Sequence, residues 1–90
     1  MQHKNEITLH LVKQFGALVK NERIKLNKSL RLLANEYELD SGNLSRIENG
    51  QIDTKLTMLW RISEALEIPL SSLIKKVEDE LGDDFHIIEQ

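Results

Sequence analysis

Residues 41–49 carry small and hydrogen-bonding side chains at the spacing of a short helix. Leu44 and Ile47 are one turn apart, and together they define the face of such a helix that would be buried. The positions that then point outward are Gly42, Ser45, Arg46 and Asn49, with Ser41 and Asn43 beside them. This outer face holds small residues, amides and one arginine, and it has no large apolar group.

These side chains are suited to reading the edges of DNA bases. Small residues let a helix approach the floor of the major groove, asparagine can form two hydrogen bonds with adenine, and arginine can form two with guanine. Each such pair is worth roughly 1–3 kcal/mol of discrimination between bases. Serine, glycine and asparagine also suit a plain solvated helix face, so the surrounding chain has to decide between the two interpretations.

The elements that would position this stretch are predicted to be helices. The chain has 90 residues, the length of one domain, and 40% of them are hydrophobic and 30% charged, with one Pro and four Gly. That composition favours helices over strands. Apolar residues recur every three or four positions in five segments, so we expect an all-α fold of five short helices.

Capping residues mark where these helices begin and end. Ser29 and Asp40 are suitable N-caps for the second and third helices. Asn27, Gly50 and Gly82 can adopt the positive φ that closes a helix. The second and third helices are then joined by a turn of about three residues, which gives them the dimensions of a helix-turn-helix.

Apolar stripes in the last two helices are expected to face the core. In the fourth helix the stripe consists of Leu56, Leu59, Trp60, Ile62 or Ser63, and Leu66. In the fifth helix it consists of Leu70, Leu73, Ile74, Val77 and Leu81. Because Trp60 lies on such a stripe, we interpret it as a core residue and not as a platform for stacking bases.

A more specific pattern runs through the second and third helices. Leu33-Ala34 is followed, at the expected separation, by Leu44-Ser45-Arg46-Ile47-Glu48-Asn49-Gly50. This pattern resembles the lambda-repressor/Cro-like helix-turn-helix family, also called the XRE family, and the resemblance covers roughly residues 15–75. It implies a lambda-repressor-like DNA-binding domain over residues 6–81, with the helix-turn-helix at about 29–48, followed by a short acidic and apolar arm over residues 82–90.

The outward face of the third helix and the resemblance agree on which residues are expected to contact DNA. The base contacts fall on Ser41, Gly42, Asn43, Ser45 and Arg46. The phosphate contacts are expected from Lys28, from the backbone amides at the start of the second helix (Ser29 and Leu30), which form a helix N-terminus suited to anions, and from Asn49, Gln51 and Lys55 in the following loop. In family members an arginine late in the first helix pairs with the glutamate of the Ile-Glu-Asn-Gly segment, so Arg23 and Glu48 are expected to form a structural ion pair that fixes the angle of the third helix.

Three residues depart from the family pattern. Leu30 stands where many relatives carry a phosphate-binding glutamine, and Asp53 stands in a loop where basic residues are common. Glu38 stands in the turn where relatives often have glycine, which carries a cost if its φ is positive. These departures predict modest non-specific affinity for DNA and a greater reliance on dimerisation.

The net charge of −3 looks unfavourable for DNA binding, but the charge is segregated along the chain. Residues 1–35 hold seven Lys and Arg against two Glu, whereas residues 76–90 hold one Lys against six Asp and Glu. A basic face can therefore exist on an acidic protein, with the acidic end directed away from the phosphates.

Dimerisation is expected because one such domain reads only half of an operator, and paired copies read two half-sites roughly 34 Å apart in a palindrome. A 90-residue core is also too small to absorb every apolar residue of the fifth helix and the arm. The residues expected at the homodimer interface are Leu73, Val77, Leu81, Phe85 and Ile87.

Other chemistries have little support. There is no cysteine, and His3, His10 and His86 lack metal-ligand spacing, so neither a metal site nor another cofactor is expected. No glycine-rich elbow accompanies the serines, which argues against an enzyme. No stretch is apolar enough to span a membrane and the first residues do not resemble a signal peptide, so a cytoplasmic location is expected.

Two alternative functions remain open. The chain could be the antitoxin of a toxin–antitoxin pair, which would bind its own operator and use the acidic arm on a protein partner. It could also be a protein-interaction adapter that has lost DNA binding. The acidic balance, Leu30 and Asp53 favour an adapter, whereas Asn43, Ser45 and Arg46 favour DNA binding. The leading interpretation is a small transcriptional regulator of the repressor or controller type, with double-stranded DNA as its partner.

Overall fold

The computed structural model describes the backbone of residues 2–88 and the side chains of residues 6–88. This part of the chain contains five α-helices and no strand. The helices are α1 (Gln2–Lys25), α2 (Leu30–Glu36), α3 (Ser41–Glu48), α4 (Leu56–Leu66) and α5 (Leu70–Leu81). The predicted all-α fold of five helices is confirmed, and α1 begins at Gln2, four residues before the expected start of the domain at residue 6.

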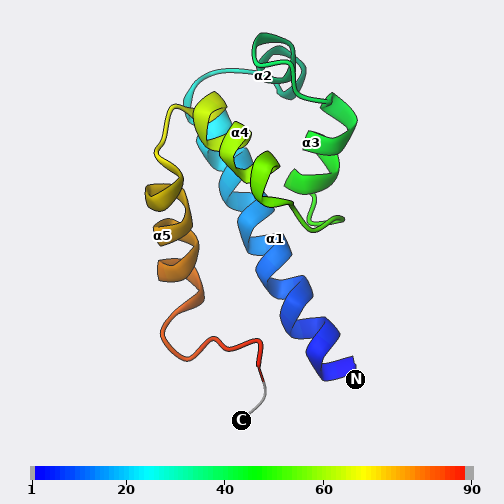
Figure 1. Ribbon diagram of the computed structural model, residues 1–90, viewed down its shortest axis with the longest axis vertical. Helices are drawn as coiled ribbons and strands as arrows, with labels where there is room; N and C mark the ends of the chain where they lie inside the picture. The colour runs from blue at the N-terminus through cyan, green and yellow to red at the C-terminus, as the bar shows by residue number, and fades with distance from the viewer. Residues whose placement is uncertain (1, 89–90) are drawn as a thin grey trace.

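The long helix α1 is the central element of the fold, against which three other helices pack. Figure 1 shows α2, α3 and α4 gathered around its C-terminal half, with α5 alongside it. Helix α1 packs against α3, α4 and α5, while α2 packs chiefly against α3. None of the described helices has both the length and the apolarity that crossing a membrane requires.

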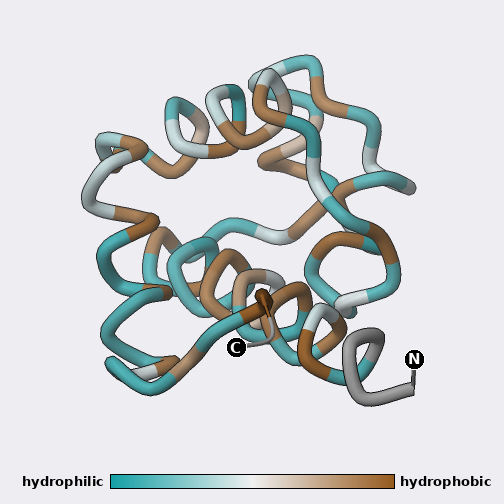
Figure 2. Tube along the Cα trace, turned by 60° about the horizontal axis from the view of Figure 1, so that its bottom comes forward, coloured by the Kyte–Doolittle hydropathy of each residue, from teal (hydrophilic) through white to brown (hydrophobic). Residues whose placement is uncertain are grey.

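The core takes residues from all five helices. Its buried apolar side chains are Phe15, Val19, Leu33, Ala34, Leu39, Leu44, Ile47, Ile62, Ala65, Leu66, Leu73 and Val77. In Figure 2 hydrophobic and hydrophilic residues alternate along the helices, as expected for helices that each bury one face. Leu44 and Ile47 are both buried, so α3 is anchored on the face that its sequence predicts.

Local hydrogen bonds define the ends of the short helices. The Ser29 hydroxyl accepts from the Leu32 amide at 3.1 Å, and the Asp40 carboxylate accepts from the Asn43 amide at 2.9 Å. Both predicted N-caps are thereby confirmed. The predicted positive φ at the helix ends is also present, at Asn27 (58°), Gly50 (69°) and Gly82 (86°).

The apolar stripe predicted for α4 is wrong in its first half. Leu56 is 67% exposed and Trp60 is 57% exposed, whereas Ile62, Ala65 and Leu66 are buried. At 100° per residue, Trp60 and Ile62 lie about 160° apart around the helix, so packing against a single core cannot cover both. The helix buries the face centred on Ile62, which leaves the largest side chain of the protein on the surface.

Glu38, in the turn between α2 and α3, adopts a φ of 54°. This left-handed backbone conformation is strained in a residue that has a Cβ atom, because the Cβ atom comes close to the following carbonyl oxygen. We expect Glu38→Gly to raise the free energy of unfolding by about 1 kcal/mol in urea denaturation, since glycine removes the strain. Glu38→Ala keeps the Cβ atom and is the control; a similar gain in that variant would show that the side chain, and not the backbone, is the source.

Candidate nucleic-acid interface

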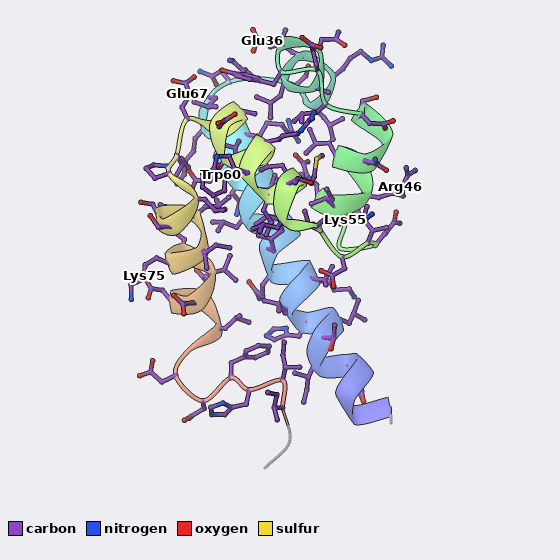
Figure 3. The ribbon with its side chains drawn as sticks, in the orientation of Figure 1. Glu36, Arg46, Lys55, Trp60, Glu67 and Lys75 are labelled. Atoms are coloured by element: carbon purple, nitrogen blue, oxygen red, sulfur yellow. The ribbon has the colours of Figure 1, made fainter. Side chains whose placement is uncertain are left out.

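The outer face of α3 lies on the surface of the molecule. Ser41, Asn43, Arg46 and Asn49 are exposed, and Gly42 and Ser45 are half-buried. Figure 3 shows Arg46 directed outward from α3, on the side away from α1. The five residues expected to contact bases therefore share one accessible face, and Leu44 and Ile47 support that face from beneath.

Arg46 is held along this face by its neighbours one turn earlier. Its Nη2 atom donates to the Oδ1 atom of Asn43 at 2.7 Å. A Cβ atom added to Gly42 would lie 3.6 Å from both terminal nitrogens of Arg46, so the guanidinium group rests over the glycine. The amide N–H groups of Asn43 and the other N–H groups of Arg46 stay available to acceptors on a ligand.

The close packing of α3 against α1 depends on Gly16, a residue not predicted to have a role. Gly16 is buried, and a Cβ atom added to it would lie about 2.9 Å from the carbonyl oxygen of Glu48 and closer still to that of Ile47. The absence of a side chain lets the two helix backbones approach closely. The available signal was a glycine in the middle of an otherwise regular helical pattern, which commonly has a packing reason.

A buried ion pair ties α3 to α1. The Nε and Nη2 atoms of Arg23 donate to the two carboxylate oxygens of Glu48 at 2.7 and 2.9 Å. The hydrogen bond with Glu48 raises the pKa of Arg23, although burial acts in the opposite direction. Nη1 of Arg23 also donates to the backbone oxygen of Lys28 at 2.8 Å, so one guanidinium group joins α1, α3 and the loop before α2.

The residues expected to contact phosphate at the start of α2 are partly engaged within the protein. The Lys28 ammonium lies 2.7 Å from a carboxylate oxygen of Glu36 and 5.7 Å from the centre of the Tyr37 ring. The hydrogen bond to Glu36 raises the pKa of Lys28. The Ser29 hydroxyl caps α2, and Leu30 is half-buried. A phosphate would have to compete with Glu36 for Lys28.

Three polar residues at the end of α3 and in the loop between α3 and α4 are exposed to solvent. Asn49, Gln51 and Lys55 are exposed, whereas the Asp53 carboxylate accepts a hydrogen bond from the Thr54 amide at 2.8 Å. The Gln51 amide donates to the backbone oxygen of Arg46 at 2.8 Å, which fixes the loop against the end of α3. The side chains of this loop are therefore accessible to the phosphates of a nucleic acid that lies beside α3.

The interface expected at α5 and the arm needs a correction. Leu73 and Val77 are buried in the core of the chain itself, so they offer no surface to a second copy. Leu81 and Phe85 are half-buried and only Ile87 is exposed, because the arm folds back onto α1, where the Phe85 and His10 rings lie 6.1 Å apart. Figure 1 shows the arm beside the N-terminal half of α1, away from α3.

No metal site is seen in the described part of the chain. Its residues form no group of three or more histidine and carboxylate side chains that could hold a metal ion. His10 contacts Phe85 of the arm and His86 is exposed. The side chain of His3 lies outside the described residues.

Comparisons with known proteins agree with this geometry. A family model described as "Helix-turn-helix" matches residues 19–73. The fold is similar to two crystal structures of the clp gene regulator ClgR from Corynebacterium glutamicum, each with a TM-score of 0.72 and 22% sequence identity. The similarity covers 82% of this chain and 96% of that chain in one structure, and 79% and 76% in the other. No curated protein matches the chain.

Proposed function

Because the chain belongs to the helix-turn-helix family of DNA-binding transcriptional regulators, we propose that it inserts α3 into the major groove of a palindromic operator as a homodimer. The observation that carries this proposal is the outer face of α3. It is exposed, it contains small residues beside one arginine and one asparagine, and it is supported by two buried apolar residues.

In the proposed complex each side chain has a defined role. Arg46 and Asn43 bond base edges, because these two side chain types can each make two hydrogen bonds to one base. Gly42 and Ser45 allow α3 to approach the bases closely. Lys55 and Gln51, on the exposed loop after α3, bond phosphates and set the register of the protein on the duplex.

The decisive experiment is selection of bound duplexes from a random oligonucleotide pool by the full chain. We expect an enriched sequence with two-fold symmetry and half-sites roughly 34 Å apart, centre to centre. Because the partner is DNA, we also propose a cytoplasmic location. Recovery of unenriched sequences at low salt, with a folded protein, would contradict sequence-specific binding.

Arg46→Ala is expected to weaken binding to the selected duplex by about 5- to 150-fold, corresponding to the loss of one bidentate base contact. Arg46 is exposed, so its removal should leave the thermal midpoint almost unchanged. Fluorescence anisotropy with the selected duplex and with a scrambled duplex measures the effect. Lys20→Ala is the control, because it removes the same charge from an exposed position on α1, and it should weaken binding to both duplexes slightly and equally. If Arg46→Ala and Lys20→Ala lose the same affinity for the selected duplex, Arg46 does not contact a base.

A further inference from the structure

A cavity bounded by α1, α4, α5 and the C-terminal arm is used by no part of the function described above. We call it the arm cavity, and its volume is about 340 Å³. Sites for small organic molecules have volumes of about 300 to 1,000 Å³ and are lined chiefly by apolar side chains. The apolar side chains that line the arm cavity are Leu11, Val12, Phe15, Leu59, Ile74, Val77, Leu81 and Phe85. In size and lining it matches the smaller sites of this kind.

The charged side chains of the arm cavity all carry the same sign. The remaining lining residues are Asp53, Thr54 and Glu78, so the cavity has two carboxylates and, among the described residues, no basic side chain. Asp53 and Glu78 are exposed, which puts them on the solvent side of the cavity, and neither forms an ion pair within the described part of the chain. Apolar walls and charges of one sign attract a ligand of the opposite charge.

One wall of the arm cavity belongs to a segment without regular secondary structure. Phe85 lies on the arm, which leaves α5 at Gly82 and folds back toward α1 (Figure 1). Its backbone amide donates to the Gly82 carbonyl oxygen at 3.3 Å, and its ring lies 6.1 Å from the exposed ring of His10. A terminal segment of this kind opens at a lower free-energy cost than a packed helix. Phe85 can therefore move aside for a ligand and close over it.

We propose that the arm cavity is a binding site for a small organic cation, an amine with an aromatic or branched aliphatic body. The body fills the space lined by Phe15, Leu59 and Leu81, and the ammonium group lies on the solvent side, near the carboxylates of Asp53 and Glu78. A neutral molecule of the same shape gains the apolar contacts without the charge attraction, and an anion is repelled. Binding of the amine does not depend on the proposed function.

The first test uses three probes of similar shape and different charge: phenylpropylamine, phenylpropanol and phenylpropionate. Each is titrated into the isotope-labelled full chain without DNA, and the shifts of the backbone amide signals in NMR spectra give both the affinity and the place of binding. We expect a dissociation constant of about 1 mM or lower for the amine, and an affinity at least about 5-fold weaker for the propionate. The shifts should centre on Leu11, Leu81 and Phe85. Equal affinities for amine and propionate, or shifts centred on another surface, would overturn the proposal.

Filling the arm cavity tests the site by shape. Leu81→Trp puts an indole group into the space, and we expect it to weaken binding of phenylpropylamine at least about 10-fold. Leu9→Trp is the matched control, because Leu9 is 44% exposed on α1 and does not line the cavity. Circular dichroism checks that both variants keep their helices. A folded Leu81→Trp protein that binds the amine as well as the unmodified chain does would contradict the site.

Removing the two carboxylates tests the site by charge, with exposed residues whose replacement does not endanger the fold. The double variant Asp53→Asn, Glu78→Gln should bind phenylpropylamine several-fold more weakly and phenylpropanol as before, since only the charge attraction is lost. The double variant Asp79→Asn, Glu80→Gln is the matched control, because it removes two charges from exposed residues that do not line the cavity. A preference for the amine over the alcohol that survives in the first variant would refute the role of the carboxylates.

A bound amine also lies close to the loop that contacts phosphates in the proposed function, and this last step rests on that function. Asp53 stands two residues before Lys55, so an ammonium group beside it reduces its repulsion of DNA phosphates. We expect saturating phenylpropylamine, but not phenylpropanol, to tighten binding to the selected duplex several-fold. An amine that binds without this effect would contradict the coupling and leave the site standing. Failure to select any duplex would contradict the proposed function alone, because the titrations above omit DNA.

Discussion

Glu48→Ala is expected to lower the free energy of unfolding by about 3–5 kcal/mol, the usual cost of removing one partner from a buried ion pair. Only 3% of the Glu48 side chain and 11% of the Arg23 side chain are exposed. Without the carboxylate, the guanidinium group of Arg23 keeps its bond to the Lys28 backbone oxygen but loses two charge-assisted hydrogen bonds in a buried site. Urea denaturation followed by circular dichroism measures the loss.

Replacing both partners separates the interaction from the cost of a stranded charge. The double variant Arg23→Met, Glu48→Leu puts apolar groups of similar length into the site, and we expect it to be more stable than Glu48→Ala, since apolar replacements of buried pairs are often nearly neutral. A double variant that is less stable than both single variants would show that the pair contributes net stability. If Glu48→Ala unfolds at the same urea concentration as the unmodified protein, the pair does not lock α3 to α1.

Much of the recognition helix could be predicted because its features are local in the sequence. Asp40 caps the helix through a hydrogen bond to the third residue on, and Leu44 and Ile47 share a face through helical geometry alone. The faces of α3 follow directly from these spacings. The Arg23 and Glu48 pair lies 25 residues apart, and only the family resemblance indicated it.

The features that the sequence did not reveal depend on where other elements lie. The α4 segment has apolar residues almost all round, so its pattern does not say whether Trp60 or Ile62 faces the core; the packing of α4 against α1 and α5 decides it. The ion pair of Lys28 with Glu36 likewise depends on how the loop before α2 folds back onto that helix. Such contacts are set by tertiary structure.

The close contact at Gly16 leads to the second large expected effect, that of Gly16→Ala. In an exposed helix this change adds about 1 kcal/mol of stability, because alanine is the better helix former. Here the new methyl group would overlap the backbone carbonyl of Ile47. Overpacking costs about 3 kcal/mol at the upper end of its range, and a rigid backbone obstacle belongs at that end. We therefore expect a net loss of about 2 kcal/mol or more in urea denaturation.

The neighbouring residue supplies the matched control. Ala17 is exposed on the same turn of α1, so Ala17→Gly should cost about 1 kcal/mol through helix preference alone and leave DNA affinity unchanged. Gly16→Ala should also weaken binding to the selected duplex beyond what its unfolded fraction explains, because α3 has to move away from α1 to make room. A Gly16→Ala protein that is more stable than the unmodified chain would mean that α3 can shift outward freely, and the orientation of the recognition helix would then not be fixed by its contact with α1.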